Sequence, residues 1–102
     1  MENVTAEQIE VLKSEGKKLL IQYTASWCGE PCNALTPRLE ALSRTYTDVT
    51  FVNVDVDENS DNATALGINT VPTVMIYDGN TLVNMSLGAN VDSVYVKILD
   101  TL

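Results

Sequence analysis

The chain has 102 residues, of which 45% are hydrophobic, and it carries a formal net charge of −8. This length suits one domain with a hydrophobic core of its own, so we expect a single domain over residues 1–102. The negative charge argues against nucleic acid or an anionic membrane as a partner, and no apolar run reaches the roughly 18 residues of a membrane span.

The N-terminal segment is polar and lacks the pattern of a secretory signal peptide, which predicts a cytoplasmic location. In that compartment a close pair of cysteines is more often catalytic than structural. The chain has two cysteines and no histidine, so we expect no metal and no other cofactor. We also expect a monomer.

Hydrophobic periodicity and turn residues divide the chain into helices and strands. In chain order, these are a helix over 5–15, a strand over 19–23, a helix over 31–46, a strand over 50–56, a short helix over 63–66, strands over 73–77 and 81–87, and a helix over 91–102. Thr5 and Gln8 form a capping-box pattern at the first helix, and Asn90 is placed to cap the last one. Pro37 lies inside the second helix, where proline predicts a kink.

The order of these elements predicts a mixed sheet. Strands that are separated by helices imply crossover connections and a parallel part. Residues 78–80 have the composition of a hairpin turn, which makes the last two strands antiparallel. Active groups gather where the parallel strands of such a sheet end, and the cysteines follow the strand over 19–23.

Both cysteines and the only tryptophan lie in Trp27-Cys28-Gly29-Glu30-Pro31-Cys32. In helical geometry the two cysteine Cα atoms would be roughly 6 Å apart, within the range of about 4.4–6.8 Å that disulfides need. Pro31 suits the first turn of a helix, so Cys28 would precede a helix N-terminus, which favours a thiolate. The pair is therefore a candidate redox site, against two alternatives: a metal cluster shared by a dimer, or inert thiols.

The chain resembles the thioredoxin family over nearly its whole length. The matching positions are the tryptophan–cysteine–glycine–proline–cysteine signature with Glu30 inserted, the helix proline at Pro37, the proline that the family holds in cis at Pro72, and the late glycine at Gly88. The resemblance implies a thioredoxin-like three-layer α/β fold, with a central mixed sheet of four to five strands flanked by four helices. The first edge strand would be short or absent near Asn3-Val4.

The resemblance also implies an activity, that of a thiol–disulfide oxidoreductase which reduces protein disulfides. Cys28 would attack a disulfide of a client protein and Cys32 would resolve the mixed disulfide. A thioredoxin reductase-like protein would supply the electrons. The client would lie against a surface formed by Trp27, Gly29, Val71, Pro72, Gly88 and Ala89, with the Val71–Pro72 bond in cis.

Three departures from the family pattern bear on this chemistry. Glu30 is inserted between the cysteines, Gln22 stands where the family has a buried aspartate, and Asn53 stands where it has the paired lysine. Two neutral amides can hydrogen-bond and avoid the desolvation cost of a buried ion pair. With Pro31, these residues are expected to tune the thiols. No buried base is evident for Cys32, and Glu30 is an alternative proton acceptor.

A second function class therefore stays open. The chain could be a thioredoxin-fold binding or accessory subunit with weak or no redox activity, which docks a partner through the surface around Trp27 and Pro72. Reduction of insulin with dithiothreitol, compared with Cys28→Ser, separates the two classes.

Overall fold

The structure is a computed structural model that describes residues 1–102. It contains five strands: β1 (Glu2–Asn3), β2 (Lys18–Thr24), β3 (Val49–Asp55), β4 (Thr73–Asp78) and β5 (Thr81–Leu87). The helices are α1 (Ala6–Ser14), α2 (Glu30–Ser43), α3 (Ser60–Ala65) and α4 (Asp92–Leu99). No helix combines the length and the hydropathy of a membrane-spanning segment.

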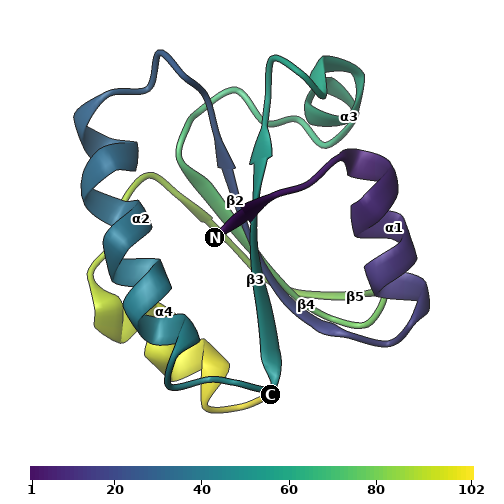
Figure 1. The fold of residues 1–102 in the computed structure, drawn as a ribbon, viewed down its shortest axis with the longest axis vertical. Coiled ribbons are helices and arrows are strands. Elements are labelled where there is room, and N and C mark those ends of the chain that lie inside the picture. Colours follow the sequence, from purple (N-terminus) through teal and green to yellow (C-terminus); the bar gives the residue numbers. More distant parts are fainter.

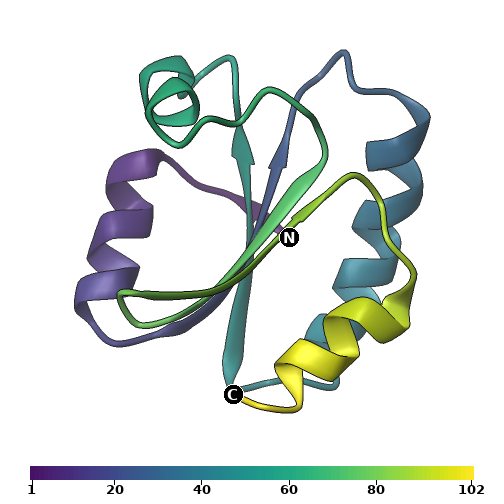
Figure 2. The ribbon, with the colours of Figure 1, turned by 180° about the vertical axis from the view of Figure 1, so that it is seen from behind.

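The strands form one mixed sheet in the order β1-β3-β2-β4-β5. β2 runs parallel to β3 and antiparallel to β4, and β5 pairs antiparallel with β4. The helices form two outer layers, with α2 and α4 on one face of the sheet and α1 and α3 on the other (Figures 1 and 2). The predicted three-layer α/β fold is confirmed.

Hydrophobic clusters fill the space on both faces of the sheet. Alternating residues of the central strands supply them: Leu19, Ile21 and Tyr23 of β2 face α1, whereas Leu20 packs with α2 and α4. Strands that are buried on both faces read as continuous apolar runs rather than alternating ones. This explains why β2 and β3 could be recognised from the sequence.

The directions of β2, β3 and β4 bring the cysteines and the segment before β4 to the same edge of the sheet. β2 and β3 are parallel and both end at the edge of the sheet that is uppermost in Figure 1, where the connections to α2 and α3 begin. β4 begins at the same edge, because Thr73 pairs with Tyr23 of the antiparallel β2. The segment before β4 therefore lies beside the connection that carries the cysteines.

Several predicted boundaries were wrong. The short helix begins at Ser60 rather than 63, because serine and acidic residues suit a first helical turn. The last helix spans Asp92–Leu99, and Asn90 does not cap it: its side-chain amide donates to the carbonyl of Leu87. The capping box of α1 is confirmed, with Gln8 N–H donating to Thr5 Oγ1 at 3.2 Å and Thr5 N–H donating to Gln8 Oε1 at 2.8 Å.

Candidate active site

A disulfide joins Cys28 to Cys32 at the start of α2. The S–S distance is 2.03 Å, the torsion about this bond is 83°, and the Cα atoms are 5.9 Å apart. The Cα separation lies within the range of about 4.4–6.8 Å that disulfides span. The inserted Glu30 therefore leaves the two cysteines within bonding distance, as the helical spacing predicted.

The turn before α2 separates the environments of the two sulfurs. Gly29 occupies the N-cap position with φ of 73°, a left-handed conformation that glycine adopts without strain, and Pro31 lies in the first turn. Cys28 precedes the helix and is half-buried, whereas Cys32 is only 4% exposed. A helix N-terminus carries partial positive charge, which stabilises a thiolate beside it.

The Val71–Pro72 peptide bond is cis, as predicted. Pro72 is buried and Val71 half-buried, and the carbonyl of Pro72 accepts a hydrogen bond of 2.8 Å from the N–H of Gly88. This bond brings Gly88 and the exposed Ala89 next to the proline, although 16 positions separate Gly88 from Pro72 in the sequence. Two of the predicted client-contact segments thus adjoin.

Trp27 is 66% exposed, an unusual state for so large an apolar side chain. Its indole Nε1–H donates a 2.7 Å hydrogen bond to Oδ2 of Asp57, in the connection between β3 and α3. The backbone N–H of Asp57 in turn donates to Oδ1 of Asp55 at 2.8 Å. The indole is therefore fixed at the surface beside Cys28.

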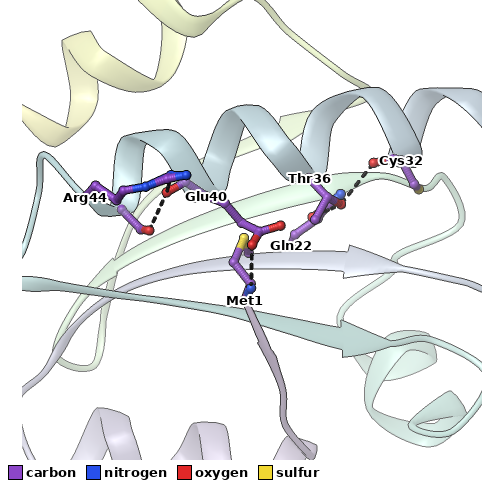
Figure 3. A network of polar contacts seen from close by, with 7 residues as sticks. Met1, Gln22, Cys32, Thr36, Glu40 and Arg44 are labelled. Carbon is purple, nitrogen blue, oxygen red and sulfur yellow. Dashed lines mark hydrogen bonds and ion pairs between the residues drawn. The ribbon is translucent and has the colours of Figure 1, made fainter.

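Thr36, one helical turn after Cys32, lies between Cys32 and Gln22 of β2 (Figure 3). Gln22 is fully buried, and its Oε1 lies 3.0 Å from the hydroxyl of Thr36, which is also 2.9 Å from the carbonyl oxygen of Cys32. Asn53 is paired with Gln22 across β2 and β3, yet no hydrogen bond joins the two amides. Gln22 Nε2 and Asn53 Oδ1 are both without a partner.

The prediction of a hydrogen bond between the side chains of Gln22 and Asn53 was therefore wrong. Gln22 interacts with Thr36 of α2 instead. The buried polar side chains of the chain are Gln22, Asn53 and Thr73, so no buried carboxylate is available to accept a proton from Cys32. This confirms the prediction that no buried base is present for Cys32.

Sequence reasoning missed three residues that the structure adds to the site region. Asp57 bonds to Trp27, Thr36 joins Gln22 to Cys32, and Arg38 of α2 bonds to the carbonyl of Asn90 in the connection between β5 and α4. Thr36 lies one helical turn after Cys32, a spacing that could have indicated it. The other two contacts join segments far apart in the sequence and left no local signal.

The family model for thioredoxin matches residues 2–101 of the chain. The chain belongs to the thioredoxin family. It is 41% identical to a thioredoxin of Geodia cydonium over 91 residues, which cover 87% of this chain and 85% of that protein. It is 36% identical to thioredoxin H8 of Arabidopsis thaliana over 96 residues, which cover 94% of this chain but only 64% of the longer plant protein.

The likeness extends to the three-dimensional structure. A solved structure of the thioredoxin of Plasmodium falciparum superposes with a TM-score of 0.87 at 31% identity, covering 99% of this chain and 98% of the other. With the cysteine pair joined in a disulfide, the chain is a thiol–disulfide oxidoreductase of the thioredoxin family. No observation favours the alternative of a binding subunit with vestigial cysteines.

Proposed function

We propose that Cys28 is the attacking thiolate and Cys32 the resolving thiol in the reduction of client proteins. The observation that carries this assignment is the difference in burial, with Cys28 accessible at the helix N-terminus and Cys32 enclosed behind it. A client sulfur can reach the first and not the second.

The electrons move in two steps. The Cys28 thiolate attacks one sulfur of the client disulfide, whose S–S bond breaks and releases the other client sulfur as a thiolate. The Cys32 sulfur then attacks Sγ of Cys28, the mixed disulfide breaks, and the second client sulfur leaves. The protein dithiol has lost two electrons to the client, and the protons of the two protein thiols pass to the client thiolates or to water.

A polypeptide client suits the surface around this pair better than a small molecule. The three hollows of the protein are lined by residues of β1, α1 and the connection between them, of the end of β3, and of α3 and the segment that leads into it. None includes Cys28, Trp27 or Pro72. An extended client segment would lie along Val71, whose backbone is available to hydrogen-bond it, and would also contact Trp27 and Ala89.

Thioredoxins act on disulfide-containing substrates and receive electrons from a thioredoxin reductase. We take a reductase of this type as the donor here and disulfide-bonded proteins as the clients. The cytoplasmic location and the monomeric state stay predictions.

Insulin reduction by dithiothreitol tests this function. The chain should accelerate the precipitation of the insulin B chain at micromolar concentration, and Cys28→Ser should abolish the acceleration. An equal rate with and without the wild-type chain would refute the proposed activity.

A further inference from the structure

The connection between β5 and α4 carries part of the proposed client surface. We call residues 88–91, which form this connection, the client loop. Leu87 before it is 61% exposed and Val91 at its end is 66% exposed. Apolar side chains presented in this way bind a partner best when the backbone that carries them is already ordered, since ordering it on binding costs free energy.

Hydrogen bonds hold the client loop from several sides. Gly88 N–H donates to the carbonyl of Pro72 at 2.8 Å. At the other end, Asn90 N–H donates to the hydroxyl oxygen of Tyr95, a wholly buried residue of α4, at 3.1 Å. These contacts join the loop to the proline segment and to the following helix.

Arg38 is the only residue that joins the client loop region to α2, the helix that carries Cys32, by a hydrogen bond or an ion pair. Its Nε–H donates to Oδ1 of Asp92 at 2.8 Å, and its Nη2 donates to the carbonyl oxygen of Asn90. The planar guanidinium thus bonds at once to the last part of the loop and to the first residue of α4.

This contact is poorly suited to stabilise the fold as a whole. The side chains of Arg38 and Asp92 are 35% and 53% exposed, and ion pairs at that exposure contribute little to the free energy of unfolding. The contact does fix the position of the loop relative to the helix of the cysteines.

We propose that Arg38 is a positioning residue for client recognition, which holds the client loop at a fixed place relative to the Cys28–Cys32 pair. The inference rests on the proposed function, because it assumes that the client lies on this loop. Arg38 makes its hydrogen bonds and ion pair with Asn90 and Asp92 and none with either cysteine, so its loss should weaken the binding of a polypeptide client and leave the chemical step unchanged.

Single-turnover kinetics with insulin as the client test this proposal. The reduced protein, freed of dithiothreitol, is mixed with increasing insulin, and the fluorescence of Trp27 reports oxidation of the pair. Arg38→Met should raise the half-saturating insulin concentration about 3- to 10-fold, as expected when a binding loop must be ordered by its ligand. The maximal rate should stay within about twofold of wild type.

Arg44→Met is the matched control. Arg44 is the C-cap residue of α2, and its guanidinium reaches only the carbonyl of Glu40 in that helix. Both variants therefore lose one positive charge, but only Arg38→Met loses the loop contact. Hydroxyethyl disulfide, too small to span the loop, should be reduced equally by all three proteins. Asp92→Asn removes the charge of the partner and should shift insulin binding in the same direction as Arg38→Met.

The outcomes separate the inference from the proposed function. If the wild type reduces insulin and Arg38→Met has the same half-saturation as Arg44→Met, the role of Arg38 is refuted and the activity stands. A fall in the maximal rate, or an equal loss with hydroxyethyl disulfide, also refutes it. A wild type that reduces neither substrate overturns both.

Discussion

The side chains around the cysteine pair differ from one another in charge. Glu30 is exposed and places a carboxylate in the first turn of α2, between the two cysteines in sequence, whereas Gln22 and Asn53 beneath the helix are buried amides. The site therefore has a negative charge on its solvent side and none in its interior. In a site with a buried carboxylate the negative charge lies in the interior instead. The first two predictions below test the exposed charge of Glu30 and the buried amide of Gln22.

Glu30→Gln should make Cys28 more reactive. A unit charge at roughly 7 Å in a dielectric of about 40–80 is worth about 0.6–1.2 kcal/mol, which corresponds to roughly a 3- to 7-fold change in the thiolate population. The rate of Cys28 alkylation by iodoacetamide at pH 7 should rise by at most this factor, because a more acidic thiol is also a weaker nucleophile, with insulin turnover equal or faster. An unchanged alkylation rate contradicts the electrostatic argument, and a large loss of turnover would make Glu30 the proton acceptor for Cys32.

Gln22→Met should change the free energy of unfolding by no more than about 1 kcal/mol in either direction. The substitution loses the contact with Thr36 but also removes the Nε2 group that has no partner, and Thr36 can still donate to the carbonyl of Cys32. Gln22→Ala is the comparison, with an expected loss of about 2 kcal/mol or more because it leaves a cavity. Urea denaturation of the oxidised proteins measures both. A loss of more than about 2 kcal/mol in Gln22→Met would show that the amide is well satisfied.

In Tyr23→Phe the free energy of unfolding should fall less steeply with rising alkaline pH than in the wild type. Burial, followed by the nearby Tyr77 and Glu10, raises the pKa of Tyr23 from 10.0 to about 12. The fold thus favours the neutral phenol of Tyr23. Its contribution to the free energy of unfolding is fully present below pH 10 and is lost as the pH rises toward 12, by an amount of the order of 2 kcal/mol. Unfolding in urea between pH 9 and 11.5 should show a steeper decline for wild type than for Tyr23→Phe. Parallel declines would contradict the assignment.

The elements show how far the sequence alone predicts this fold. Apolar runs identified β2 and β3 because both faces of these strands are buried, and the turn at Gly79 and Asn80 identified the hairpin of β4 and β5. Helix ends were predicted less well, because Asn90 uses its amide in the loop rather than as a cap. The cysteines and the cis-proline could be found by their motifs, whereas the contacts of Asp57 and Arg38 depend on tertiary packing.

The capping box of α1 offers a test at the scale of one element. Thr5→Ala removes the hydroxyl that accepts from Gln8 N–H and should lower the free energy of unfolding by about 1 kcal/mol. Thr5→Ser keeps the oxygen and should lose much less. Equal losses in the two variants, measured by thermal unfolding, would show that the cap contributes nothing.

In the molecule as a whole, one edge of the sheet collects the functional groups of three connections. The cysteines follow β2, Asp57 follows β3, and Pro72 precedes β4, while the client loop reaches the same proline through Gly88. The hydrophobic layers on both faces hold this edge in place. The proposed reduction of a client disulfide requires that Cys28 attacks first and that Cys32 then resolves the mixed disulfide.

Trapping of the mixed disulfide tests that order most directly. Cys32→Ser, reduced and mixed with insulin, should accumulate a covalent adduct in which Cys28 is bonded to an insulin cysteine, detectable by mass spectrometry of the intact species and of its peptides. Cys28→Ser should form little or none in the same time, because Cys32 is enclosed. Faster adduct formation by Cys28→Ser than by Cys32→Ser would contradict the assignment of Cys28 as the attacking thiolate.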